Sequence, residues 1–203
     1  MQITSMVLPC ETFRLLSACL LAGTLWGAGP SCPELEHSDM AQHASYLERS
    51  RQNLTSDCIQ FAISELERSA YAPGAAVLTS YLDFRVASAN FIRGEHQVVI
   101  NHLPWLDEYP AAHALFAIGR AATDSLVGAI ASDNASDITR TNAGEVLLAI
   151  NSENMAEAVA TLTRASKAAP NAVVAGRLRD AATRLAQKCP GFELRSACEL
   201  ALN

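Results

Sequence analysis

The chain has 203 residues, which is enough for one domain of ordinary size with a sizeable core. Half of its residues are apolar and only 18% are charged, a share that is low for a disordered chain. Alanine, the best helix former, is abundant, so the composition favours an all-α fold. The net charge of −6 argues against nucleic acid as a partner, because phosphate binding needs a cationic face, and it gives no attraction to an anionic membrane surface.

Residues 1–29 are predicted to be a signal peptide for export. Arg14 precedes the 12-residue apolar run Leu15–Trp26, which is too short to span a bilayer comfortably, and small residues follow at 27–29. A short N-terminal core helix is the alternative. Residues 16–19 resemble a lipobox, but the apolar run follows Cys19 instead of preceding it, so we do not expect a lipoprotein. The mature chain would be periplasmic or secreted, without a stable membrane span.

Four of the six cysteines, Cys32, Cys58, Cys189 and Cys198, lie beyond this signal. An even number in an exported chain predicts disulfides, and four cysteines allow three pairings. We favour Cys32–Cys58 and Cys189–Cys198, because the members of each pair are close in sequence. The spacing contains no C-x-x-C pair, so it supports neither a zinc ribbon nor a thioredoxin-like site. In a cytosolic chain the same four would be free, buried thiols.

Apolar residues at helical spacing, separated by capping and breaking residues, predict helices along the chain after a proline-containing linker at residues 30–37. We expect Ala76, Ile138 and Val173 among their buried positions. The predicted helices cover residues 39–52, 57–71, a segment beginning at 73–74, 110–118, 120–130, 137–150, 155–168, 172–188 and 192–202.

Residues 83–109 are predicted to form an irregular insertion, because they contain a glycine, a proline and mixed periodicity. Four aromatic rings occur in it, those of Phe84, Phe91, Trp105 and Tyr109. They either fill a gap between neighbouring helices or contact a ligand or partner, since long loops in compact domains are often functional.

One pattern occurs twice, 39 residues apart: an arginine followed by apolar residues three, six and seven positions later. The two sets are Arg140, Ala143, Val146 and Leu147, and Arg179, Ala182, Leu185 and Ala186.

Residues 117–150 resemble the helix–turn–helix unit of the HEAT-like repeat family. The likeness lies in Ile118-Gly119, in apolar residues at 122, 126, 127 and 130, in the polar turn 133–137 and in the pattern that begins at Arg140. Weaker likenesses cover residues 57–83 and 155–188, and the whole chain also looks like exported bacterial HEAT-repeat proteins. The resemblance implies a short right-handed α-solenoid of helical hairpins at 57–203, interrupted by the insertion 83–109 and preceded by a linker and helix at 30–56. A generic helical bundle is the alternative.

The resemblance also implies a role for Arg140 and Arg179. In this fold an arginine at that place can bridge to a carboxylate in a neighbouring turn, and Asp137 and Asp180 are the nearest in sequence. The alternative is a solvated charge that contributes little.

No catalytic or metal-binding pattern is present in the sequence. It contains no G-x-S-x-G, no G-x-x-x-x-G-K and no H-E-x-x-H, and the paired His-Glu motifs of the hydroxylases built on the HEAT-like fold are missing. We therefore expect no metal, no cofactor and no enzymatic activity.

The function predicted is that of a binding or scaffolding module for a protein or peptide, because stacked repeats present an extended surface. The candidate surface combines residues of the insertion with second-helix positions expected to be exposed: Phe91, Trp105, Tyr109, Thr141, Glu145 and Arg177. One alternative is an exported enzyme or ligand-binding protein with its site in the insertion, using His96, His102, Glu108 or Tyr109. A purely structural envelope protein is the other.

Overall fold

The computed structural model describes residues 32–49, 51–86 and 108–203, and these belong to one unit, Cys32–Asn203. Every regular element in those ranges is helical and none is a strand, so the all-α prediction is confirmed. The α-helices are α1 Met40–Leu47, α2 Ser56–Arg68, α3 Ala75–Thr79, α4 Pro110–Ile118, α5 Thr123–Ala131, α6 Asp137–Ile150, α7 Met155–Lys167, α8 Ala172–Lys188 and α9 Phe192–Leu200. Short 3-10 turns lie at Arg51–Asn53, Ala72–Gly74 and Gly119–Ala122.

Side-chain caps set the beginnings of several helices. Asp39 and Gln42 form a capping box at α1, in which each side chain bonds to the backbone N–H of the other residue. Ser136 accepts from the N–H of Thr139 at the start of α6, and Asn171 accepts from that of Val174 at the start of α8. These bonds satisfy N–H groups that have no partner inside the helix.

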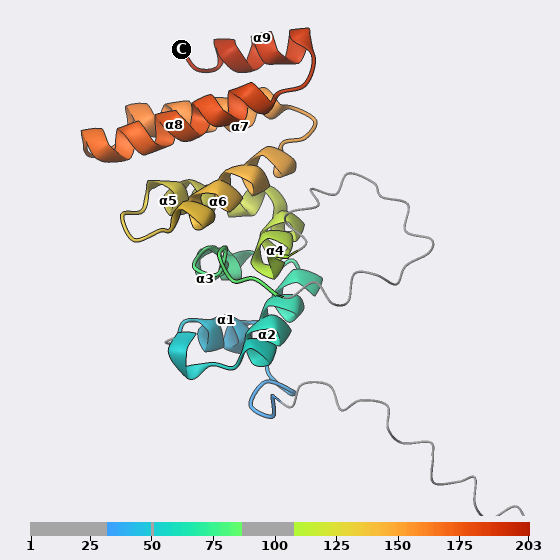
Figure 1. Ribbon diagram of the computed structural model, residues 1–203. Helices are drawn as coiled ribbons and strands as arrows, with labels where there is room; N and C mark the ends of the chain where they lie inside the picture. Colours follow the sequence, from blue (N-terminus) through green and yellow to red (C-terminus); the bar gives the residue numbers. More distant parts are fainter. Residues whose placement is uncertain (1–31, 50, 87–107) are drawn as a thin grey trace, which may run out of the picture. The chain divides into compact units, whose positions relative to one another are not determined.

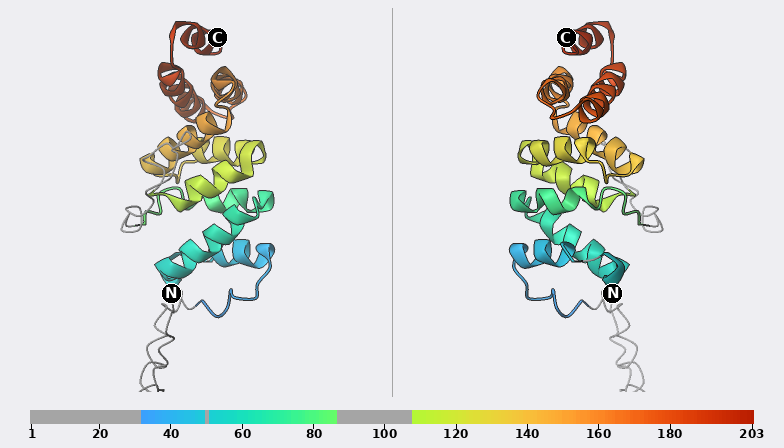
Figure 2. Two further views of the ribbon diagram at one scale, coloured as in Figure 1. Left: turned by 90° about the vertical axis from the view of Figure 1, so that its right-hand side faces the viewer. Right: turned by 90° about the vertical axis from the view of Figure 1, so that its left-hand side faces the viewer.

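The helices pair as hairpins: α1 with α2, α3 with α4, α5 with α6 and α7 with α8. Within the Cys32–Asn203 unit, successive hairpins contact one another in chain order (Figures 1 and 2). Helix α2 packs on α4 and α4 on α6, while α3 packs on α5. Most helices are therefore covered from two sides, by their own hairpin partner and by a helix of the next hairpin.

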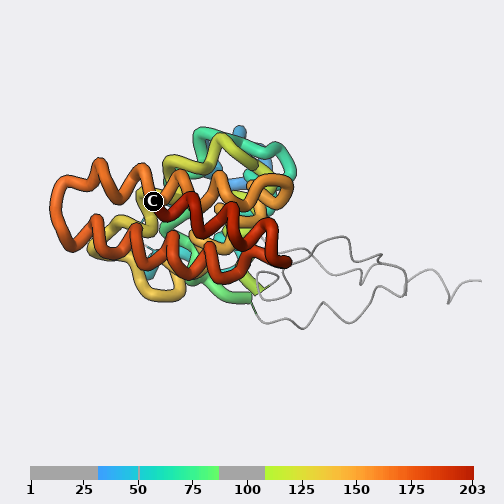
Figure 3. Tube along the Cα trace, turned by 90° about the horizontal axis from the view of Figure 1, so that it is seen from above, coloured from blue at the N-terminus to red at the C-terminus, as the bar shows by residue number. Residues whose placement is uncertain are grey.

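The last hairpin packs differently on its predecessor. Helix α8 contacts both α5 and α6, and α7 contacts α6. Helix α9 then lies over the α7–α8 hairpin and contacts both of its helices (Figure 3). Because α8 covers α5 and α6 together, one face of α6 that would otherwise meet water is buried.

The core consists mainly of leucine and alanine, with a few isoleucine, valine, aromatic and cysteine side chains. Its largest side chains with less than 2% exposure include Leu47, Ile63, Leu66, Leu78, Leu82, Leu115, Leu126, Ile130, Leu147 and Leu162. Three predicted core positions are wrong. Ile138 is 50% exposed and Val173 61% exposed, because each lies in the first turn of its helix. Ala76 is exposed because α3 turns its neighbour Ala75, with Leu78, toward the core.

Both predicted disulfides are present, which confirms the favoured pairing. Cys32 bonds to Cys58 and so ties the segment before α1 to the first turn of α2. Cys189 bonds to Cys198 and so ties the end of α8 to α9. All four residues are buried.

The stretch Pro110–Ala131 is long and apolar enough to cross a membrane by length and composition alone. In the structure Gly119, with φ of 69°, divides it into α4 and α5. Its large side chains Leu115, Leu126 and Ile130 are fully buried against other helices of the unit. Core helices of soluble proteins pass the same composition test, so this stretch is weak evidence for a membrane span.

Candidate functional site

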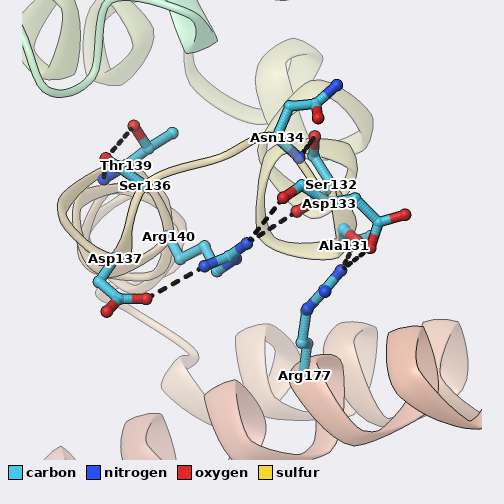
Figure 4. Close-up of polar contacts among 9 residues, drawn as sticks. All are labelled: Ala131, Ser132, Asp133, Asn134, Ser136, Asp137, Thr139, Arg140 and Arg177. Atoms are coloured by element: carbon cyan, nitrogen blue, oxygen red, sulfur yellow. Dashed lines mark hydrogen bonds and ion pairs between the residues drawn. The ribbon is translucent and has the colours of Figure 1, made fainter.

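Two arginines from different helices hold the turn between α5 and α6 (Figure 4). From α6, Arg140 donates from Nη2 to the carbonyl oxygen of Ser132 at 3.0 Å and from Nη1 to the carboxylate of Asp137 at 3.1 Å. The predicted partner of Arg140 is therefore confirmed.

The arginine that joins this turn to the next hairpin is Arg177. Its Nη1 donates to the carbonyl oxygen of Ala131 at 3.1 Å and to the carboxylate of Asp133 at 2.5 Å (Figure 4). Arg179, expected to be the equivalent of Arg140, is exposed, and its side chain forms no ion pair within the described ranges. The alternative of a solvated charge therefore holds for Arg179. Because α8 packs on α5 as well as on α6, Arg177 reaches the α5–α6 turn, whereas Arg179 does not.

Of the three second-helix positions predicted to be exposed, only Thr141 is freely exposed. The prediction for Glu145 is wrong: the residue is 4% exposed, and its carboxylate pairs with the ammonium group of Lys188. Helix α8 covers this face of α6, which sequence periodicity alone could not reveal. Arg177 is partly buried and committed to the contacts with the α5–α6 turn.

The base of the predicted insertion is closed by contacts between its two ends. The N–H of Val86 donates to the carbonyl oxygen of Glu108 at 3.0 Å, and the guanidinium of Arg85 pairs with the Glu108 carboxylate at 2.5 Å. The side-chain hydrogen bond from Arg85 lowers the pKa of the Glu108 carboxyl. Tyr109 is half-buried against the core just before α4. Phe91, His96, His102 and Trp105 lie outside the described residues.

The segment that leads into the insertion is anchored to two helices, α1 and α6. The hydroxyl of Tyr81 donates to the carbonyl oxygen of Leu47 at 2.8 Å, and Nδ2 of Asn142 donates to that of Leu82 at 2.7 Å. Phe84 is buried, with its ring edge-on to that of Tyr81. Phe84 therefore packs in the core, which agrees with the structural alternative for this ring.

A groove that sequence reasoning missed lies between the end of α1 and helix α3. Its volume is about 430 Å³. We call it the arginine groove, and its lining residues are Leu47, Glu48, Arg49, Arg51, Ala76, Val77, Ser80 and Tyr81. The sequence predicted one helix over 39–52, whereas α1 ends at Leu47. In a continuous helix, residues two positions apart do not share a face, but here the helix has ended and both arginines line the groove.

Both arginines of the groove are held in place by carboxylates and rings. Nη1 of Arg49 donates to the carboxylate of Glu34 at 2.8 Å, and its guanidinium lies 5.0 Å from the centre of the Tyr46 ring. Such contacts restrict a side chain that otherwise has many conformers.

Arg51 is held in the same manner. Its Nη1 donates to the carboxylate of Asp83 at 2.7 Å, and its guanidinium lies 5.2 Å from the Tyr81 ring centre and 5.4 Å from that of Phe84. The side chains of Arg49 and Arg51 remain 57% and 41% exposed. Each guanidinium is therefore paired with a carboxylate and still partly exposed.

Among the residues that the structure describes, no three histidine, cysteine, aspartate or glutamate side chains lie together in a way that could hold a metal ion. No protein-family model matches the chain, and comparison with curated proteins and with solved structures finds no match either.

Proposed function

We propose that this protein is a non-enzymatic binding module, in which a short right-handed α-solenoid of HEAT-like hairpins offers its surface to a protein or peptide. The contacts between successive hairpins support this architecture. Stacked repeats present more continuous surface than a globular domain of the same length.

The observation that carries the proposal is the arginine groove. It lies between two successive hairpins and combines aliphatic side chains with two arginines, each paired with a carboxylate. Its volume of about 430 Å³ falls within the range of small ligand pockets, roughly 300–1,000 Å³. A groove of this size and lining suits a few side chains of a bound peptide.

An exported location agrees with the proposal. Two disulfides close both ends of the unit Cys32–Asn203, and disulfides persist in oxidising compartments. The predicted signal peptide, residues 1–29, lies outside the described residues.

The alternative of an enzyme with its site in the insertion gains no support from the candidates that the structure describes. A general acid needs a raised pKa, whereas the hydrogen bond from Arg85 lowers the pKa of Glu108. Glu108 thus resembles a structural ion-pair partner more than a catalytic group.

The test is crosslinking of the intact exported protein in its native host, with surface variants. Ala76→Trp should fill the arginine groove from an exposed position on α3, and Thr141→Arg probes the outer face of α6. Gln60→Trp on α2 is the matched control, since Gln60 is exposed and lies away from the groove lining. We expect Ala76→Trp to abolish capture of a specific partner and Gln60→Trp to leave it unchanged.

Capture that survives both Ala76→Trp and Thr141→Arg, in variants with unchanged urea midpoints, would refute the proposal. Turnover of a substrate by the purified protein would refute its non-enzymatic part.

A further inference from the structure

We propose that two copies of this chain associate through α9, whose outer face pairs antiparallel with α9 of the second copy about a two-fold axis at Ser196. This inference goes beyond the proposed binding function and does not rest on it. It concerns the α9 end of the stacked hairpins, whereas the arginine groove lies between α1 and α3.

The first step concerns the place of α9 in the stack. Each helix from α1 to α8 has a hairpin partner. Helix α9 packs with one side on α7 and α8 and, in the described part of the chain, has no helix on its other side (Figures 1 and 2). The outermost helix of a stacked array ordinarily presents a polar face to water. A polar outer face is therefore expected for α9.

The outer face of α9 is instead apolar. Phe192 is 87% exposed and Leu200 is 74% exposed, the two highest values among the exposed large hydrophobic side chains that the structure describes. They lie four positions on either side of Ser196, so the three residues share one face of the helix. Cys198, two positions after Ser196 and hence nearly opposite to it on the helix, is 0% exposed. Phe192 and Leu200 therefore point away from α7 and α8.

This face is complementary to itself. In an antiparallel pair centred on Ser196, Phe192 of each copy lies level with Leu200 of the other along the helix axes. The small side chain of Ser196 at the centre allows the two helices to approach closely. Self-complementarity is what an isologous two-fold contact requires, and the pairing removes both apolar side chains of each copy from water.

The charges on α9 favour the same arrangement. Arg195 and Glu199 are exposed, and neither forms an ion pair with another described residue. Both line the groove between α8 and α9, so they lie on the same flank of α9. Because the partner helix runs in the opposite direction, Arg195 of each copy lies beside Glu199 of the other. Glu193 lies on the other flank and stays in water.

The size of α9 sets the strength of the contact. The helix has nine residues, so the pair buries less than the roughly 1,200 Å² at which stable interfaces begin. We therefore expect a reversible dimer that dissociates at micromolar concentrations, not a permanent one.

The experiment is sedimentation velocity of the full mature protein, with its disulfides intact, from about 1 to about 200 µM. We expect the average mass to rise over this range from that of one chain toward that of two. Phe192→Glu with Leu200→Glu should weaken dimerisation by about tenfold or more, because it places carboxylates in the contact. Val173→Glu is the matched control: Val173 is an apolar side chain on α8 that is 61% exposed, and its replacement should leave dimerisation unchanged.

A charge exchange tests the antiparallel register. Arg195→Glu and Glu199→Arg should each weaken dimerisation by about threefold or more, because each sets like charges side by side across the axis. The double variant that carries both changes should dimerise as the unaltered protein does. Circular dichroism and urea midpoints show which variants are folded, and the charge variants supply the measurement if the glutamate pair at 192 and 200 unfolds.

A protein that stays monomeric over the whole range would overturn the inference. A dimer that survives Phe192→Glu with Leu200→Glu would also overturn it, since the contact would then lie elsewhere. If the double charge variant fails to restore the dimer, the antiparallel pairing is wrong. None of these outcomes bears on the proposed function, which is tested by Ala76→Trp at the other end of the unit.

Discussion

Arg177 and Asp133 form an ion pair at 2.5 Å that joins α8 to the turn between α5 and α6. The same guanidinium donates to the carbonyl oxygen of Ala131, one of the last in α5 and therefore without a partner inside that helix. Arg140 donates from α6 to the carbonyl oxygen of Ser132 in the same turn. Two hairpins thus meet at one turn that both of them stabilise.

The first prediction concerns this junction. Arg177→Ala should lower the free energy of unfolding by about 1–2 kcal/mol, because it removes a charge-assisted hydrogen bond at a partly buried helix end. Arg179→Ala should change it by less than about 0.5 kcal/mol, since that side chain is exposed. Urea denaturation at pH 7 measures both. Equal costs would show that the Arg177 contacts contribute nothing specific.

Local features of the fold could be predicted from the sequence, because they depend on neighbouring residues. The helix predicted over 172–188 has those bounds in the structure, where Asn171 caps it. The disulfides follow from proximity along the chain, and Asp137 as the partner of Arg140 follows from a spacing of three residues on one helix.

Features that depend on packing between hairpins could not be predicted. The burial of Glu145 depends on α8 lying against α6, and the role of Arg177 depends on α8 lying against α5. The arginine groove depends on where α1 ends, and the sequence pattern extended that helix through Arg51. Hydrophobic periodicity defines one face of a helix but does not say which later helix covers the other.

The second prediction concerns the pair formed by Glu145 and Lys188, whose side chains are 5% and 45% exposed. Lys188→Ala should cost about 3 kcal/mol, because it leaves the Glu145 carboxylate buried without its partner. Glu145→Gln should cost less, about 1 kcal/mol, because the ammonium group can reach water. Urea denaturation of both single variants and the double variant gives the coupling energy. The opposite order of costs would contradict the burial of Glu145.

The third prediction concerns the disulfides. The chain-entropy relation gives about 3.5 kcal/mol for Cys32–Cys58, whose separation is 26 residues, and about 2.5 kcal/mol for Cys189–Cys198, whose separation is 9. Replacing Cys32 and Cys58 by serines should therefore lower the free energy of unfolding more than replacing Cys189 and Cys198 does. Intact mass before and after reduction is the control, since each bond gains hydrogen on reduction. A mature chain without that gain would contradict both bonds.

The fourth prediction concerns pH and Glu67 on α2. Burial raises the pKa of the Glu67 carboxyl above its ordinary value of 4.5, and the nearby His113 partly opposes this. The folded state therefore binds the proton more tightly than the unfolded state does. The stabilisation from this proton is fully present below pH 4.5 and is lost as the pH rises through the folded pKa.

Glu67→Gln should therefore raise the urea midpoint more at about pH 7 than at about pH 4, because burial penalises the carboxylate and an amide carries no charge at either pH. The matched control is Glu153→Gln in the exposed turn after α6, which should change the midpoint little at either pH. Urea denaturation at both pH values measures the midpoints of the two variants and of the unaltered protein. A variant of Glu67 that is less stable at pH 7 than the unaltered protein would mean that the attraction to His113 outweighs the cost of burial.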